Sequence, residues 1–347
     1  MSKLICSRKI GGVVRTVLSL MIAMSVCAMV ALPAHALNCG DAITADVTLT
    51  ADLGPCTGNG ISVDGIPAHV TVNLNGHTLR GTGNGGGITL GAAFPGVTIK
   101  GPGKIANFAT GVSAGGAATD LMIYDVTFIG NPQAISLNGA SSANIRILNN
   151  TIQSGGRGQT AINASNEGNV YIYQNVITGF SVAAISILGQ TTMTADENFI
   201  SQNQAGIVSD TFLTCTVIRG NNVTLNRANG IQMGVDPTAQ KHARAELVST
   251  SSCNDIEDNT VTSNGNNGIF VQGGDYSPIV QNNIVSGNQG NGISIVGAGA
   301  SGTMQVLGNR VSNSSGMDLL WDSNGNTCWT QNIFTTSSPA TLPPPCS

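Results

Sequence analysis

The chain is short of charged and aromatic side chains, and these shortages limit what it can be. Charged residues make up 9% of its 347 positions and aromatic residues 4%, whereas glycine occurs 45 times. Four of the 14 basic residues lie in the first 36 positions, which leaves ten basic against 18 acidic residues, a net charge of −8. That balance excludes a basic groove for nucleic acid. The core must therefore be built from stacked aliphatic side chains.

A helical periodicity is also missing, and a strand repeat takes its place. Residues 254–321 contain the same unit three times: Asn-x-Val, a bend rich in Gly, Asn and Ser, and a Gly followed by an apolar residue. The apolar residues Ile269, Ile293 and Met317 lie 24 positions apart. A fixed period of this size, filled with short alternating runs, predicts a solenoid whose turns consist of strands.

The same apolar anchor recurs through most of the chain. Its positions are Ile61, Ile88, Val112, Ile135, Ile162, Ile185, Ile207, Ile231, Ile269, Ile293 and Met317. The intervals run from 22 to 27 residues except for one of 38, between Ile231 and Ile269. We therefore expect about eleven coils in one domain rather than two globular domains.

On this repeat, residues 60–335 resemble the right-handed parallel β-helix superfamily, which includes pectate-lyase-like enzymes and carbohydrate-binding and sugar-hydrolase repeats. The resemblance implies an all-β fold, a single-stranded right-handed parallel β-helix. It does not select an activity, because the superfamily hosts lyases, hydrolases, epimerases, adhesins and non-catalytic scaffolds.

Residues 1–36 have the pattern of a secretory signal peptide. Basic residues open the segment, an apolar run covers 17–32, and Ala-His-Ala at 34–36 forms a small-residue cleavage site. An apolar run of about 16 residues is short for a membrane helix. We expect a secreted or periplasmic protein that begins near Leu37 and has no membrane segment after cleavage.

The remaining chain is expected to have three parts. Residues 37–59 alternate apolar and polar positions and are expected to form an N-terminal cap over the first coil. The β-helix is expected to cover 60–321, and residues 322–347, which contain Trp329 and a Pro-rich tail, a C-terminal cap. Caps are needed because the ends of a solenoid expose unpaired strand edges.

Six cysteines follow the signal segment, and an even count in an exported chain indicates disulfide bonds. When the strands are aligned on the repeat, Cys215 and Cys253 occupy the same position of consecutive coils, about 4.8 Å apart. The other pairs close short loops at the two ends, Cys39–Cys56 and Cys328–Cys346. No Cys-x-x-Cys or His spacing indicates a metal site. We expect no cofactor, and the sequence leaves open whether calcium is used.

One Asn stands at the same corner of eight successive coils. The positions are Asn150, Asn175, Asn198, Asn221, Asn259, Asn283, Asn309 and Asn332. Asn tolerates a left-handed backbone, and stacked amides can hydrogen-bond to one another. We interpret this ladder as structural.

Functional side chains must point outward, and outward positions alternate with inward ones along a strand. Beside the Gly–apolar anchor, they form a neutral column with one carboxylate at its end: Ser62, Thr89, Ser113, Ser136, Asn163, Ser186, Val208, Gln232, Phe270, Ser294 and Asp318. Polygalacturonases and pectate lyases have groups of acids, or acids with a basic residue, that this column lacks. The resemblance to them therefore ends at the scaffold.

A second outward column, two residues before the ladder Asn, carries most of the charge. It contains Tyr124, Leu148, Tyr173, Asp196, Arg219, Glu257, Gln281, Leu307 and Thr330. Nearby outward or corner positions add Tyr171, Glu197, Asp255 and Asp258. One interpretation is a surface ladder of alternating charge that neutralises itself. The other is a functional site, since perturbed charges gather at such sites.

The interval of 38 residues contains an insertion at 234–252. An Asp-Pro pair near its start fits the N-cap and first position of a helix, and good helix formers follow. We expect a short helix that places Lys241, His242 and Arg244 beside the acidic cluster. Long excursions from a rigid scaffold are where binding residues concentrate.

Two hypotheses of function follow, and the sequence does not decide whether the protein is an enzyme. In the first, it is a lyase or epimerase for an extended polysaccharide, in which a cation neutralises a sugar carboxylate while a base moves the neighbouring proton. The catalytic candidates are His242, Arg219 and Tyr173, and those for substrate binding are Asp196, Lys241, Arg244, Asp255 and Glu257. In the second, it is a non-catalytic surface-binding, adhesin-like or structural β-helix. In both, the partner is a polysaccharide or cell-surface glycan, and we expect a monomer.

Overall fold

The computed structural model describes most of the chain after residue 36. The described ranges are 37–65, 69–91, 96–116, 119–139, 144–156, 158–189, 191–209, 215–234, 253–272, 278–297, 303–322, 326–342 and residue 345. Every regular element in these ranges is a β-strand. None of the described residues belongs to a helix long and apolar enough to cross a membrane. The segment predicted as a signal peptide, 1–36, lies outside these ranges.

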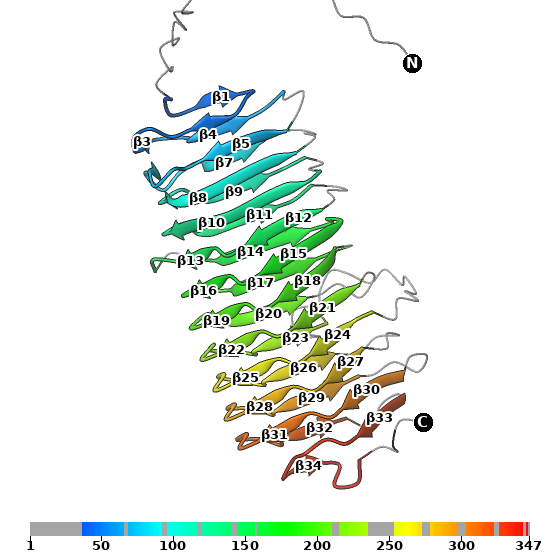
Figure 1. The fold of residues 1–347 in the computed structure, drawn as a ribbon. Helices are drawn as coiled ribbons and strands as arrows, with labels where there is room; N and C mark the ends of the chain where they lie inside the picture. Colours follow the sequence, from blue (N-terminus) through cyan, green and yellow to red (C-terminus); the bar gives the residue numbers. More distant parts are fainter. Residues whose placement is uncertain are drawn as a thin grey trace, which may run out of the picture. The chain divides into compact units, whose positions relative to one another are not determined.

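The strands stack in parallel, turn upon turn (Figure 1). Thirteen of them form one sheet, here called sheet A. Its strands are β1 (Asp41–Ile43), β4 (Ile61–Val63), β7 (Gly86–Leu90), β9 (Thr110–Ala114), β11 (Gln133–Leu137), β14 (Thr160–Ser165), β17 (Ala183–Leu188), β20 (Ala205–Ser209), β23 (Ile231–Met233), β26 (Ile269–Gln272), β29 (Ile293–Val296), β32 (Leu319–Trp321) and β34 (Ser337–Ser338). The eleven strands from β4 to β32 bound about ten full turns, one fewer than the eleven coils predicted from the repeat.

Each turn also contributes to a second row of strands, row B. Its strands are β2 (Val47–Thr48), β5 (Val70–Asn73), β8 (Val97–Ala106), β10 (Leu121–Ile129), β12 (Ile145–Leu148), β15 (Asn169–Tyr173), β18 (Thr192–Asp196), β21 (Thr216–Arg219), β24 (Asp255–Glu257), β27 (Ile279–Gln281), β30 (Thr303–Leu307) and β33 (Asn326–Thr330).

A third row, row C, follows row B around the corner. Its strands are β3 (Leu53–Cys56), β6 (Thr78–Gly81), β13 (Thr151–Gln153), β16 (Val176–Thr178), β19 (Phe199–Ser201), β22 (Asn222–Thr224), β25 (Thr260–Thr262), β28 (Ile284–Ser286) and β31 (Arg310–Ser312). The long strand β10 belongs to both rows, since it pairs with β12 and with β13.

The predicted anchors line the core of sheet A with one exception. Each anchor from Ile61 to Ile293 pairs with the next one in register, and all ten are completely buried. The eleventh prediction, Met317, is wrong: Ile293 pairs with Leu319, and Met317 is 39% exposed. The Gly-Met pair imitates the motif, but the turn before β32 is two residues longer.

That shift also corrects the predicted end of the hydroxyl-rich column. The outward residue paired with Ser294 is Leu320, not Asp318. Asp318 is 2% exposed, and its carboxylate accepts hydrogen bonds from the backbone N–H groups of Ser314, Thr335 and Thr336. It therefore fastens the C-terminal segment to the last turn.

The predicted Asn ladder is present. From Asn150 to Asn332, the Nδ2 of each Asn donates to the Oδ1 of the next, at 2.9–3.0 Å. A second ladder, which we did not predict, joins Asn203, Asn226, Asn264 and Asn288 at 3.0–3.1 Å. Every member of the two ladders except Asn332 is buried, so these amides satisfy backbone groups that water cannot reach.

Two predicted disulfides are confirmed. The Cα atoms of Cys39 and Cys56 are 5.4 Å apart, and those of Cys215 and Cys253 are 5.0 Å apart. Cys328 is disulfide-bonded as well, and its predicted partner, Cys346, lies outside the described residues. The segment expected as the N-terminal cap provides β1, β2 and β3, which pair in parallel with β4, β5 and β6.

Candidate functional site on the outward face of row B

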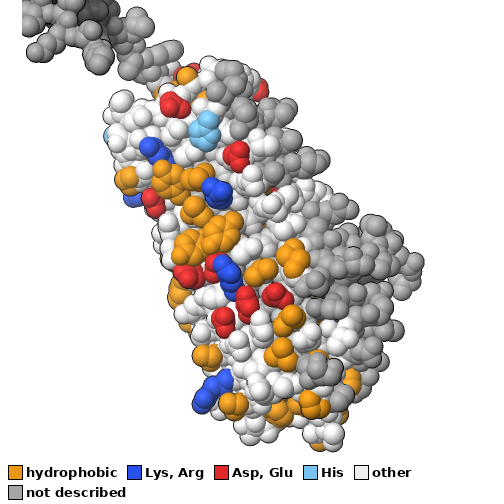
Figure 2. Space-filling model, turned by 45° about the vertical axis from the view of Figure 1, so that its right-hand side comes forward, with side chains coloured by type: hydrophobic (Ala, Val, Ile, Leu, Met, Phe, Trp, Pro, Cys, Tyr) orange, Lys and Arg blue, Asp and Glu red, His pale blue; other side chains and the backbone are white. Residues whose placement is uncertain are grey.

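Two outward columns of row B form the candidate site, which we call the B face. Neighbouring strands are in register, so residues of one column lie above one another, about 4.8 Å apart. From β10 to β27 the first column is Tyr124, Leu148, Tyr173, Asp196, Arg219, Glu257 and Gln281. The second column is Met122, Arg146, Tyr171, Thr194, Val217, Asp255 and Ile279. Figure 2 shows hydrophobic, basic and acidic side chains gathered along this side of the molecule.

The centre of the B face is a pair of stacked tyrosines on β15. The rings of Tyr171 and Tyr173 are 5.6 Å apart between centroids, with 12° between their planes. Two residues of spacing on one strand places both rings on the same side. Leu148 and Tyr124 continue the first column on the two preceding turns. Three of the chain's four tyrosines therefore share one face.

An ion pair joins the next two turns. Arg219 donates from Nη2 to Oδ2 of Asp196 at 2.8 Å, and the Tyr171 hydroxyl donates to the same oxygen at 3.1 Å. The Arg219 side chain is 49% exposed and that of Asp196 is 9% exposed. The hydrogen bond to Asp196 raises the pKa of Arg219, and burial followed by that same carboxylate raises the pKa of Tyr171.

Glu197 stands at the corner beside this pair. Its backbone is left-handed, with φ of 51°, and its side chain is exposed. Gln174 donates to its Oε2 at 2.8 Å, and a hydrogen bond to Glu197 raises the pKa of Tyr173. On the next turn Gly220 leaves room for it, since a Cβ there would lie 3.3 Å from the Glu197 Cγ.

Two more carboxylates lie on β24, one turn beyond Arg219. Burial, and then the charge of Glu257, raises the pKa of Asp255. Its Oδ1 is buried without a hydrogen-bond partner, because the column neighbours are Val217 and Ile279. Glu257 accepts a hydrogen bond from Gln281 at 2.9 Å. Arg219 therefore pairs with Asp196 and not with Glu257, although both adjoin it in the column.

The structure thus brings five predicted site residues onto one face. They are Tyr173, Asp196, Arg219, Asp255 and Glu257. Lys241, His242 and Arg244 lie outside the described residues, as does the helical insertion predicted at 234–252 apart from Gly234. Among the residues that are described, no cluster of His, Cys, Asp or Glu is arranged to hold a metal ion. Sequence reasoning placed Tyr124, Tyr171 and Tyr173 at outward positions and made Tyr173 a catalytic candidate, but it did not predict the stacking of the Tyr171 and Tyr173 rings.

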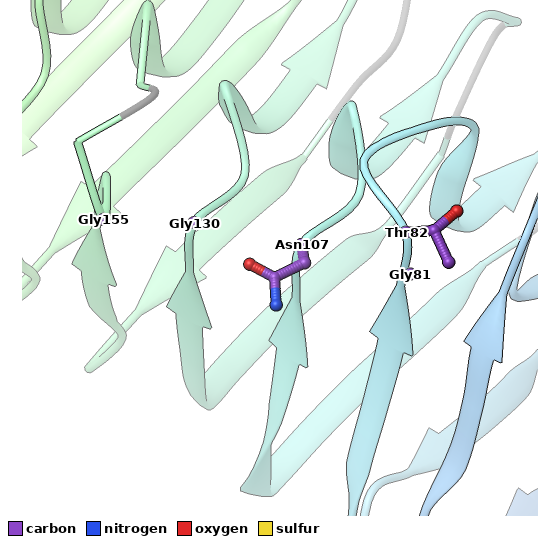
Figure 3. Close-up of a pocket in the computed structure, with 5 residues that line it drawn as sticks. All are labelled: Gly81, Thr82, Asn107, Gly130 and Gly155. Atoms are coloured by element: carbon purple, nitrogen blue, oxygen red, sulfur yellow. The ribbon is translucent and has the colours of Figure 1, made fainter.

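A shallow depression lies elsewhere, at the ends of row C strands. Its volume is about 330 Å³, and it is lined by Gly81, Thr82, Asn107, Gly130 and Gly155 (Figure 3). Its lining consists of glycine backbone with one hydroxyl and one amide. It contains no titratable side chain, so it offers less chemistry than the B face.

The chain was compared with curated sequences, solved structures and protein families. No curated protein sequence matches the chain. Among solved structures, the A-module of Azotobacter vinelandii mannuronan C-5 epimerase AlgE6 aligns with 87% of this chain and 92% of its own, at 12% identity and a TM-score of 0.44. The AlgE4 A-module from the same organism aligns with 88% and 90%, at 13% identity and a TM-score of 0.41. The family described as right handed beta helix region matches residues 95–238, 133–314 and 240–335, more than half of the sequence, and the chain belongs to that family.

Proposed function

We propose that the protein is exported and binds an extended polysaccharide laid along the B face. The observation that carries this proposal is the stacked pair Tyr171 and Tyr173 on an outward strand face. Aromatic rings that carry a polar group suit surfaces where one side of a ligand is apolar and the other is wet. A pyranose ring has both properties, with C–H groups on its faces and hydroxyls at its rim.

The direction of the polysaccharide follows from the register. Potential contacts repeat every turn, about 4.8 Å apart, from Tyr124 past Tyr173 to Glu257. A polymer that runs along the column meets ring contacts first and hydrogen-bonding carboxylates next. A compact ligand would use only one or two turns of this face. The repeated geometry therefore supports an extended ligand.

Export is supported by two features. Disulfides join Cys39 to Cys56 and Cys215 to Cys253, and such bonds persist in oxidising compartments. The sequence pattern of 1–36 is that of a secretory signal peptide. A secreted or periplasmic location would place the B face where polysaccharides occur.

A lyase or epimerase reaction is the second candidate. It needs a cation that faces the sugar carboxylate. Among the residues of β18, β21 and β24, Arg219 is the single basic residue, and it already donates to Asp196. The geometry therefore favours binding over uronate chemistry. Incubation with oligouronates tests this directly, by absorbance for unsaturated products and by NMR for epimerised ones; either product would establish catalysis.

The binding proposal is tested by tyrosine substitution. The purified protein is screened against soluble polysaccharides by calorimetry, and the best ligand is titrated into Tyr171→Ala and Tyr173→Ala. We expect each to lose at least about tenfold in affinity, the scale of aromatic anchors in binding sites. Phe199→Ala is the matched control, since Phe199 is 40% exposed on row C. Equal affinities in all three variants would refute binding at the B face.

A further inference from the structure

We infer that the polysaccharide bound along the B face carries free amino groups, as an unacetylated hexosamine polymer does. This inference rests on the proposed binding function and names the chemical class of its ligand. The tyrosine pair determines where the polysaccharide lies on the B face. The charge of the neighbouring turns determines which charged groups the polysaccharide must carry.

The three turns after the tyrosine pair are strongly acidic. On β18, β21 and β24 and their corners the carboxylates are Asp196, Glu197, Asp255, Glu257 and Asp258. Among the described residues of these strands and corners, Arg219 is the single basic residue, and Arg227 lies beyond row C on the same turn as Arg219. The guanidinium of Arg219 is neutralised by Asp196, which leaves four carboxylates to face a ligand. A sugar carboxylate placed here would be repelled, and an ammonium group would be attracted.

The carboxylates are held apart, which favours a cation with repeated charges. Glu197 is held by Gln174 and Tyr173, and Glu257 by Gln281. Residues of β18 and β24 are two turns apart, about 10 Å. A polymer with an amine on each sugar can present one charge to each end of this interval. Burial, and then the charge of Glu257, raises the pKa of Asp255.

The basic side of the B face lies beyond the tyrosines. Arg146 is one turn before the pair, and Lys100 is two turns before Arg146. By the turn spacing, Arg146 is about 20 Å from β24, farther than the Debye length of physiological salt. It therefore does not compensate Asp255, Glu257 or Asp258. The acidic half of the face keeps its own preference for a cationic ligand.

The test compares hexamers whose sugars carry a free amine, an acetylated amine or a carboxylate. Glucosamine hexamer, N-acetylglucosamine hexamer and galacturonate hexamer are titrated into the purified protein by calorimetry at mildly acidic pH and low salt. We expect the glucosamine hexamer to bind at least about tenfold tighter than the other two, with an advantage that falls as salt is added. Tighter binding of the acetylated or uronate hexamer overturns the inference.

Two conservative variants locate the charge effect. Glu257→Gln and Asp258→Asn keep the shapes of the side chains, and Asn tolerates the left-handed backbone of Asp258. We expect each to weaken glucosamine hexamer binding severalfold and to weaken N-acetylglucosamine hexamer binding by a smaller factor. Unchanged affinity for the glucosamine hexamer in both variants overturns the inference.

The tyrosine variant separates this inference from the function beneath it. If Tyr173→Ala abolishes binding of an acetylated or uronate hexamer that binds best, the B face binds glycan and only the amino preference is wrong. If no hexamer depends on Tyr173, the proposed function itself fails. Hexalysine is the remaining probe. If it binds as tightly as the glucosamine hexamer and is insensitive to Tyr173→Ala, the acidic turns attract any cation and the inference is overturned.

Discussion

Each turn of the solenoid has two positions, two residues apart, that follow opposite rules. The corner position is Asn in eight successive turns, and these Asn side chains hydrogen-bond to one another and are buried in all but the last turn. The outward position before it changes at every turn from Leu148 to Gln281. An Asn inside the ladder, such as Asn259, hydrogen-bonds to the turn before it and to the turn after it, so it is constrained from two directions. An outward residue is constrained only by its local partner and by whatever it binds.

The difference between the Asn column and the outward column indicates where a repeat protein carries its functional residues. A column with the same residue type in every turn satisfies the hydrogen bonds of buried backbone groups. A column whose side chains change within a few turns does not have that structural role. On the B face the change runs from tyrosines to carboxylates between β15 and β24. The hydroxyl-rich column of sheet A changes little from Ser62 to Ser186 and contains no charge there. The B face is therefore the stronger candidate.

Removing one Asn from the ladder should produce the largest loss of stability. In Asn259→Ala, the backbone N–H and Nδ2 of Asn221 lose their acceptor, and the Ile218 carbonyl loses its donor. Buried groups left unsatisfied cost about 1–3 kcal/mol each, so we expect a loss of roughly 3 kcal/mol or more in the free energy of unfolding. Urea titration followed by circular dichroism measures it.

The control lies one turn earlier and at the surface. Asn222 is exposed at the start of β22, and Asn222→Ala should change the unfolding free energy by less than about 0.5 kcal/mol. A similar loss in both variants would mean that the ladder is only a consequence of the repeat.

Removing a charged residue from the outward column should cause a smaller loss of stability. Arg219→Ala leaves the carboxylate of Asp196 with the Tyr171 hydroxyl alone. Because Arg219 is half exposed, solvent screens the pair, and we expect a loss of about 1 kcal/mol. Thermal unfolding of Arg219→Ala against Arg310→Ala checks this, since Arg310 is exposed on row C. A larger loss than in Asn259→Ala would reverse the ranking of the two columns.

The sequence predicted the scaffold well because the scaffold is periodic. Ten anchors, the Asn ladder and the Cys215–Cys253 disulfide all depend on one repeat length, so a single alignment locates them. Met317 was misassigned because Gly316-Met317 matches the motif letter for letter. The register is instead set by the longer turn that leads to Leu319. Sequence pattern cannot rank two candidate anchors two residues apart when both are apolar.

The site was predicted only as a set of neighbours. Register places Arg219 equally close to Asp196 and Glu257, so spacing alone cannot choose its partner. The choice depends on burial, because Asp196 is nearly enclosed and needs a charge, whereas Glu257 has Gln281. The tyrosine stack likewise depends on side-chain rotamers, which a strand pattern does not specify. Three-dimensional packing was needed for both.

The smallest expected effect is on the pH dependence of stability, and it concerns the carboxylates of β24 on the B face. Burial and the charge of Glu257 raise the pKa of Asp255 above its ordinary value of 3.8. Below that value both the folded and unfolded states hold the proton, and Asp255 contributes nothing to stability. As the pH rises above 3.8, the unfolded state loses the proton first, so stability falls until folded Asp255 ionises too.

The stability of Asp255→Asn should therefore match that of the parent at low pH and exceed it at neutral pH, by less than about 1 kcal/mol after solvent screening. Glu257→Gln should give part of this gain, since it removes only the second cause. Melting temperatures across pH measure both variants, and parallel curves for parent and Asp255→Asn would show that the negative charge of these turns is already compensated.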